Sequence, residues 1–480
     1  MRWRPIIIGL LVTAGSLLLL NGYLLSTNPY ARWSVIQLPY DTYLANDTIS
    51  YKQNFQTRVY GNGLADALGY YKSGLLIIQN SLFGSRPVAG NSADEIINNI
   101  HDMRFDPSKP YLISGDQFSV LYVRNLGVFY NRLLEPDIAR SPQDWENKQR
   151  IYLQSVLYGI DGLSASRTPK TTVIPIGPRS AVLTQVHPGS YGSDSVYGLL
   201  YAIERLRSQD TSEDNRYHQQ TKPAAEQIIR ERKDQLRQII DNYLNTIRDP
   251  QTGLVKTNLD LASARDGVTR SSSLYDNIVM WKTLELADEL GIRETSDSEQ
   301  AQLYQKILDT YWSPELGCFQ DSINNKTSYS SDWLIALPTE FLNPQTDQDK
   351  LTSCVAYIRN HRLAEPLPIK YSDESNPEGP WAVRTFVPNY GGNAIWSYWG
   401  AEYITLLANL DKTTNDPSYK AEAQRHINTY HQKMVEYHGF PETFDANGNF
   451  LQNAVYKSIR STGWVVQLEY AEWLLKQPTN

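Results

Sequence analysis

A short aromatic loop near the end of the chain presents a lone glutamate that could act in acid/base chemistry. The loop reads Gly439-Phe440-Pro441-Glu442-Thr443-Phe444-Asp445, and an apolar segment that predicts the last helix follows at 463–475. Loops of this kind on a helical scaffold present single carboxylates to bound sugars. Glu442 is therefore a candidate for one half of an acid/base pair, although it could instead cap the turn that follows it.

The partner carboxylate must come from an upstream loop. Asp266 lies in an Arg-Asp-Gly segment ahead of a helix predicted to begin near residue 272, and Asp194 lies in a Tyr/Gly/Ser segment at 187–197. Glycoside hydrolysis needs one carboxylic acid to protonate the leaving oxygen and a second carboxylate on the opposite face of the sugar. Asp266 and Glu442 meet this need if the helices close into a ring. Asp266 could also be a turn residue, and Asp194 could be a helix N-cap.

Other chemistries have little support in the sequence. The seven histidines form no H-E-x-x-H pair, and the chain has no G-x-S-x-G elbow and no G-x-x-x-x-G-K loop. Asp445 begins a segment that resembles a calcium loop, but Phe450 stands where that loop needs glycine. We expect neither a metal site nor an organic cofactor.

The composition favours a carbohydrate partner. A formal net charge of −7 argues against nucleic acid, whose binding needs a basic surface. The chain has 32 Tyr and 11 Trp, whose flat apolar faces and polar edges suit sugar rings, although ordinary packing uses part of them.

The N-terminus predicts a membrane anchor. Arg2 and Arg4 precede an uncharged apolar run at residues 5–25, and about 21 helical residues span roughly 30 Å, the thickness of the hydrocarbon core of a bilayer. The basic flank predicts a cytoplasmic N-terminus, so the main domain would lie outside the cytoplasm on a single-pass anchor. A cleaved signal peptide, which would make the protein secreted, is the alternative.

The rest of the chain predicts a helical domain. We expect an anchor at 1–26, a linker or edge segment at 27–61 and a catalytic domain at 62–480, with almost no strands. An even number of helices with long aromatic loops predicts an all-α fold, an (α/α)6 toroid. The helices expected from apolar periodicity and end signals cover about 63–83, 92–103, 116–133, 142–160, 193–208, 221–248, 272–291, 298–313, 346–361, 393–409, 416–436 and 463–475. Cys318 and Cys354 could form one disulfide or remain two buried thiols.

Four segments together resemble the six-hairpin glycosidases, the superfamily that holds trehalase, neutral/alkaline invertase, processing α-glucosidase and debranching-glucosidase domains. The Gly-Phe-Pro-Glu-Thr-Phe-Asp loop is similar to the W-P-E-Y-Y-D loop of the invertase branch, where the glutamate is the catalytic base. The segment at 266–277 resembles the one that carries the general acid. Segments 191–197 and 388–396 are similar to the V-D-S-G-L-W-W and N-G-G-x-W stretches.

The resemblance implies an inverting glycoside hydrolase with acid Asp266, base Glu442 and no cofactor. The substrate-binding residues that it implies are Arg124, Asn125, Tyr191, Asp194, Asp276, Asn389, Tyr390, Trp396 and Lys457. Asp260 and Asp276 are rivals for the acid, and Trp396 could instead be a core residue.

One departure leaves other functions open. Relatives have W-x-R-D where this chain has Tyr122-Val-Arg-Asn125, so an amide replaces a carboxylate. A catalytically inactive glycan-binding protein on the same fold is therefore one alternative. A polysaccharide lyase is another, suggested by His187 and Tyr191.

Overall fold

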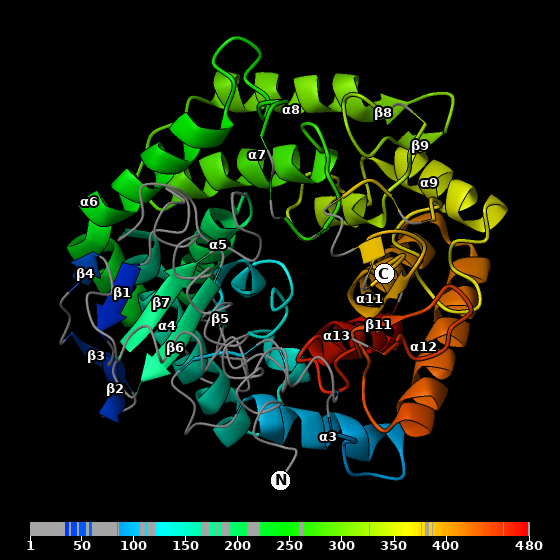
Figure 1. Cartoon of the computed structure of the whole chain (residues 1–480), viewed down its shortest axis with the longest axis horizontal. Coiled ribbons are helices and arrows are strands. Elements are labelled where there is room, and N and C mark those ends of the chain that lie inside the picture. The colour runs from blue at the N-terminus through cyan, green and yellow to red at the C-terminus, as the bar shows by residue number, and fades with distance from the viewer. Residues whose placement is uncertain are drawn as a thin grey trace, which may run out of the picture.

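The chain folds into paired helices that close into a ring, as the computed structural model shows (Figure 1). The structure describes residues 84, 86–105, 111–113, 115, 121–164, 192–208, 221–259, 261, 263–265, 267–325, 327–375, 377–379, 384–385, 387–454 and 456–478, and the backbone of the strands at 34–37, 40–45, 48–53, 57–59, 172–177 and 180–184.

The helices lie close to the ranges that apolar periodicity predicts. Their bounds are α3 Ala93–Arg104, α4 Pro142–Ser164, α5 Ser195–Ser208, α6 Lys222–Ile247, α7 Leu274–Glu289, α8 Asp297–Tyr311, α9 Gln348–Asn360, α11 Ser397–Thr414, α12 Pro417–Tyr437 and α13 Val465–Lys476, with short 3₁₀ helices η1 Val123–Leu126, η2 Pro136–Ile138 and η3 Ser331–Ala336. The helix expected at 63–83 lies outside the described residues.

Inner and outer elements alternate along the chain. The inner ring contains η1 and η2, then α5, α7, η3, α11 and α13. Helix α5 contacts η1, and from α5 onward each element contacts the next until α13 meets η2. The outer helices are α3, α4, α6, α8, α9 and α12, and Figure 1 shows α6, α8 and α12 outside α5, α7 and α11. Because an outer helix returns the chain between successive inner ones, the inner helices run in the same direction and begin at one end of the ring.

Local sequence explains where several helices begin. The hydroxyl of Ser273 accepts a hydrogen bond from the amide of Asp276 at the start of α7, and Ser296 caps α8 in the same way. Asp416 caps α12 ahead of Pro417 at the first helical position. Inner helix α7 is buried nearly all round, whereas outer helix α6 buries one face, and the core therefore lies between the rings.

The helix predicted at 116–133 is wrong for the residues that the structure describes. Residues 121–134 form strand β5 Leu121–Tyr122, then η1 and a series of turns. Gly127 packs against Gly198 of α5, and a β-carbon on Gly127 would lie 2.7 Å from the Gly198 Cα. This backbone-to-backbone packing leaves no room for the side chains of a regular helix.

The prediction of almost no strands is also wrong. A five-stranded antiparallel sheet of order β4-β1-β7-β6-β5 lies beside α4, and short hairpins occur elsewhere. All the described strands have only two to six residues, so alternation of apolar and polar residues along them is hard to recognise in the sequence. The remaining bounds are β1 Ser34–Gln37, β2 Tyr40–Ala45, β3 Thr48–Gln53, β4 Thr57–Val59, β6 Thr172–Gly177, β7 Ser180–Thr184, β8 Trp312–Ser313, β9 Cys318–Phe319, β10 Ile395–Trp396 and β11 Thr443–Phe444.

The anchor and the domain boundaries remain predictions. Residues 1–26 lie outside the described residues, and strands β1–β4 fall within the segment 27–61. Within the part of the chain that the structure describes, no helix is both long enough and apolar enough to span a bilayer.

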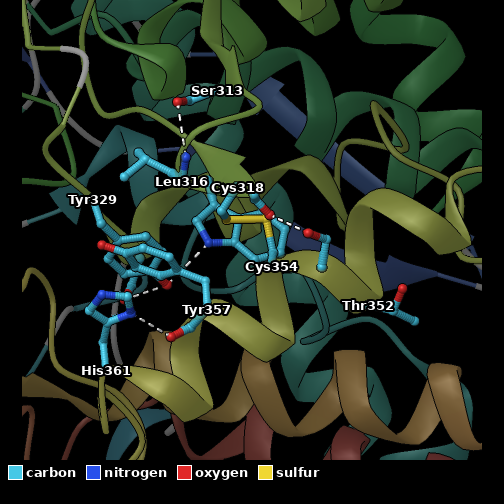
Figure 2. The surroundings of a disulfide bond; sticks show 12 residues. Ser313, Leu316, Cys318, Tyr329, Thr352, Cys354, Tyr357 and His361 are labelled. Carbon is cyan, nitrogen blue, oxygen red and sulfur yellow. Dashed lines mark hydrogen bonds between the residues drawn. A yellow bond between two sulfur atoms is a disulfide. The ribbon is translucent and has the colours of Figure 1, made fainter.

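A disulfide joins Cys318 of β9 to Cys354 of α9 (Figure 2). The hydroxyl of the neighbouring Ser353 donates to the carbonyl of Gly317 at 2.6 Å. One turn further along α9, the ring of Tyr357 stacks on Tyr329 with centroids 5.2 Å apart. The disulfide therefore holds the β8–β9 hairpin against an outer helix.

Removing this disulfide should lower the stability of the fold. Cross-linking two residues 36 positions apart restricts the unfolded chain by about 4 kcal/mol in the chain-entropy account. We expect the double variant Cys318→Ala/Cys354→Ala to unfold at a clearly lower temperature in a thermal melt. Treating the wild type with a reductant should lower its melting temperature similarly and leave the variant unchanged. The prediction would be contradicted if reductant left the wild-type melting temperature unchanged and the double variant had the same melting temperature.

Candidate active site

The backbone of Glu442 is fixed by two other segments of the chain. Its amide donates to the carbonyl of Ile459 at 2.8 Å, and its carbonyl accepts from the amide and the hydroxyl of Ser397, each at 3.1 Å. The approach of the two loops requires Gly439, where a β-carbon would lie 2.3 Å from the carbonyl oxygen of Arg460. Glu442 is therefore held where α11 begins, at one end of the inner ring.

Tyrosine hydroxyls contact both side-chain oxygens of Glu442. Tyr390 donates to Oε1 and Tyr456 donates to Oε2, each at 3.2 Å, and the glutamate is only 8% exposed. Burial and the charge of Glu442 raise the pKa of Tyr456 well above its ordinary value. Tyr456 therefore keeps its proton and acts as a hydrogen-bond donor.

Asn389 and Trp396 support Tyr390. Asn389 has a positive φ of 66°, and its carbonyl accepts from the amides of Gly392 and Ala394 in a tight turn. The indole nitrogen of Trp396 donates to the carbonyl of Tyr390 at 2.8 Å. Trp396 is 3% exposed and stacks on Trp464, so the structure places it in the aromatic core beside the site.

Asp266 and its rival Asp260 lie outside the described residues, but the arginines around Asp266 are described. Arg265 donates to Asp321 and to the carbonyl of Gly391, each at 2.7 Å. Arg270 donates to Asp321 at 2.8 Å and to Asp332 at 2.7 Å.

This network joins the surroundings of the two predicted carboxylates. Gly391 follows Tyr390, whose hydroxyl contacts Glu442, and Arg265 precedes Asp266. The segment that carries Asp266 is thus tied directly to the segment that contacts Glu442. The side chains of Arg265 and Arg270 are 1% and 5% exposed and both pair with Asp321, which holds these two arginines close together.

Asp194 and Asp276 lie at the starts of neighbouring inner helices. Asp194 is fully buried before α5 and accepts a hydrogen bond from the hydroxyl of Tyr275 at 3.0 Å. Asp276 accepts from the hydroxyls of Ser193 and Ser273, each at 2.5 Å. Burial raises the pKa of Asp276, opposed by the charge of Arg270. Asp276 therefore links the starts of α5 and α7. This structural role explains its burial, although the sequence also made it a candidate for the general acid.

Arg124 and Asn125 lie in η1. A guanidinium nitrogen of Arg124 donates to the carbonyl of Ser263 at 2.8 Å, close in sequence to Asp266. Asn125 is 4% exposed, and its carbonyl accepts from the amide of Tyr130 at 2.7 Å. The structure thus brings Arg124 beside the loop that was predicted to carry the acid.

The remaining predicted residues are Tyr191 and Lys457. Tyr191 lies outside the described residues. Lys457 is half-buried next to Tyr456, and its alkyl chain packs so closely on Gly84 that a β-carbon there would lie 2.8 Å from the lysine Cδ.

Sequence reasoning missed the parts played by Tyr456 and Asp321. Tyr456 comes 14 residues after the glutamate that it contacts, and Asp321 lies more than 50 residues after Arg265. A pattern confined to one segment cannot reveal either contact. The sequence showed only the residue types, a tyrosine and a charged residue in aromatic loops. Many surface loops contain the same residue types.

The described residues include the segment that resembles a calcium loop. No cluster of metal-ligating side chains occurs among the described residues. In the segment that resembles a calcium loop, Asp445 accepts hydrogen bonds from the amides of Asn447 and Asn449. The carboxylate therefore stabilises its own turn.

Comparison with known proteins identifies the fold. No family model and no curated protein matches the sequence. A rhamnosidase from Klebsiella oxytoca, solved with rhamnose bound, is similar with a TM-score of 0.50 at 13% identity, over 92% of this chain and 81% of that chain. The neutral trehalase of Saccharomyces cerevisiae gives a TM-score of 0.47 at 13% identity, over 77% and 74% of the two chains. The likeness to the rhamnosidase confirms the predicted (α/α)6 toroid, the fold of the six-hairpin glycosidases.

Proposed function

We propose that the protein is an inverting glycoside hydrolase in which Glu442 is the general base and Asp266 the general acid. The observation that carries this proposal is the setting of Glu442. Its backbone is anchored to two segments, and both carboxylate oxygens accept hydrogen bonds from tyrosine hydroxyls. Hydrogen bonds donated to a carboxylate favour its ionised form, which is the form that a base needs.

The reaction follows from the two carboxyl groups. Asp266 donates its proton to the glycosidic oxygen as the bond from that oxygen to the anomeric carbon breaks. Glu442 removes a proton from a water molecule, whose oxygen attacks the anomeric carbon from the other face. The configuration at that carbon inverts, and each carboxyl group ends the step in the opposite protonation state. This chemistry requires no metal or organic cofactor.

The substrate proposed is an oligosaccharide or an envelope glycan. Tyr390 and Tyr456 contact Glu442, and Lys457 follows Tyr456 in the chain. The aromatic side chains suit hydroxyl-bearing sugar rings. The rhamnose held by the similar rhamnosidase supports a carbohydrate as the class of ligand.

A direct test is to incubate the full-length protein in detergent with a panel of oligosaccharides and envelope glycans and to measure the release of reducing sugar. We expect release from at least one glycan, and the first product seen by proton NMR should have the anomeric configuration opposite to that of the substrate. Binding without release would favour a glycan-binding protein, and an unsaturated product would favour a lyase.

We also propose that residues 5–25 anchor the protein in a lipid bilayer with the ring outside the cytoplasm. The apolar run with two arginines before it supports the anchor. The disulfide between Cys318 and Cys354 supports the location, because such bonds persist in oxidising compartments.

The anchor predicts how the protein fractionates. The full-length chain should stay with the membranes after a carbonate wash, whereas a chain that begins at Ser26 should remain in the supernatant. Immunoblotting of the two fractions measures the difference. A mature N-terminus found just after residue 25 would replace the anchor with a cleaved signal peptide.

A further inference from the structure

Two tyrosines from different segments hold the Glu442 carboxylate. Tyr390 contacts Oε1 from the turn that precedes α11, and Tyr456 contacts Oε2 from the segment that leads to α13. The two rings also pack edge to face, with centroids 5.7 Å apart. The carboxylate is therefore restrained at both oxygens by groups that restrain one another.

The backbone of Tyr456 is itself held in place. Its amide donates to the side-chain oxygen of Asn453 at 2.9 Å, and its carbonyl accepts from the amide of Asn453 at 2.7 Å. Gln452 and Lys457 pair across the same turn. The hydroxyl of Tyr456 thus has a fixed position, and the direction of its hydrogen bond is set by the fold.

Two roles are open to a tyrosine in this position. It could react, as a nucleophile or a base, or it could orient the carboxylate. Burial and the neighbouring negative charge both raise the pKa of Tyr456, which disfavours the phenolate that a reacting tyrosine needs. A hydroxyl that keeps its proton can donate to the carboxylate, and two such donors on different oxygens fix the plane of the Glu442 carboxylate.

We propose that Tyr456 is a positioning residue which, together with Tyr390, orients the Glu442 carboxylate toward the attacking water and keeps it ionised. This inference rests on the proposed function for the identity of the base. Tyr390 and Tyr456 are ionisable groups in contact with the Glu442 carboxylate, and Lys457 and Arg460 follow Tyr456 on the same segment.

The first test measures the titration of Glu442 without a substrate. Infrared difference spectra of full-length protein in detergent, with the Glu442→Gln spectrum subtracted, follow the protonated carboxyl band as pH is varied. Loss of a hydrogen bond to a charged group should move the midpoint upward by about one to two pH units in Tyr456→Phe. Tyr437→Phe is the matched control, because Tyr437 packs on Phe444, two residues after Glu442, and its loss should leave the midpoint unchanged.

The second test uses the glycan from which the wild type releases most reducing sugar. In Tyr456→Phe, kcat should fall about 10- to 100-fold while KM stays near the wild-type value. The acidic limb of kcat/KM should move to higher pH, because that limb reports the ionisation of the base in the free enzyme. Tyr390→Phe should act in the same direction, and the melting temperature of each variant separates these effects from loss of the fold.

The outcomes are distinct. An unmoved Glu442 midpoint in Tyr456→Phe would overturn the positioning role. Turnover as low as that of Glu442→Gln with an unmoved midpoint would also overturn it, because Tyr456 would then be a reacting group. A fully active Glu442→Gln variant would instead overturn the proposed function, while the infrared titration would still report whether the tyrosines hold the carboxylate.

Discussion

Replacing Glu442 with glutamine should lower turnover by about 10²- to 10⁴-fold, the usual contribution of a general base. The amide has nearly the shape of the carboxylate and can still accept one hydrogen bond, but it cannot take a proton from water. The backbone contacts of Glu442 with Ile459 and Ser397 do not depend on its charge. We therefore expect little change in melting temperature, and measurement of kcat together with a thermal melt checks both statements.

Glu436→Gln is the matched control for this variant. Glu436 lies six residues earlier, in the last turn of α12, and forms an exposed ion pair with Lys433 at 2.8 Å. An exposed pair contributes little to stability, and this one is away from the loop that carries Glu442. The control should have wild-type turnover. Equal turnover in wild type and Glu442→Gln would remove Glu442 from the mechanism.

The second large effect is a dependence on the leaving group. Loss of the general acid lowers the cleavage rate most when the leaving group is poor, because a good leaving group departs without protonation. Asp266→Asn should therefore nearly abolish cleavage of a natural glycoside and retain much of the activity on the corresponding glycosyl fluoride. Steady-state rates on the two substrates measure the split, which Glu442→Gln should not show.

Asp276→Asn separates the acid from its neighbour. Asp276 is buried between Ser193 and Ser273, so its variant should lower the melting temperature and affect both substrates alike. A leaving-group split in Asp276→Asn or in Asp260→Asn, with normal rates in Asp266→Asn, would move the acid to that residue. The two-carboxylate mechanism would remain, with a different acid.

Much of the ring could be predicted from local sequence. Helix α4 follows Ser141-Pro142, and apolar residues recur on one face at Leu153, Val156 and Leu157, so both its start and its buried face follow from short-range rules. The cap at Ser273 similarly marks the start of α7. Such signals depend on neighbours within one turn, which is why the helix bounds agree closely with the structure.

The rest depends on contacts between distant residues. The segment at 121–134 is apolar enough for a helix, but it packs on Gly198, more than 60 residues away. The pairing of β1 with β7 joins residues that are well over 100 positions apart. The buried bridge from Arg265 through Asp321 to Arg270 likewise needs the closed ring before its three members can meet.

The candidate site divides in the same way. Glu442 could be selected from sequence because it is a lone glutamate in a short aromatic loop before the last predicted helix, and the structure places it among tyrosines where the inner helices begin. The hydroxyl of Tyr456 and the carbonyl of Gly391 had no comparable signal, because their roles come from where other loops bring them. Spacing along a chain can suggest a reacting group, whereas the groups that orient it follow from the tertiary fold.

The separation of the Asp266 and Glu442 carboxyl groups in a crystal structure tests the central claim most directly. An inverting hydrolase needs room for a water molecule between the sugar and its base, so we predict a separation of about 6.5–9.5 Å across an open pocket. A separation near 5 Å would indicate a retaining mechanism with Glu442 as nucleophile. A separation beyond about 12 Å, well outside the range that two carboxyl groups flanking one glycosidic bond can have, would contradict the assignment of these residues as an acid/base pair.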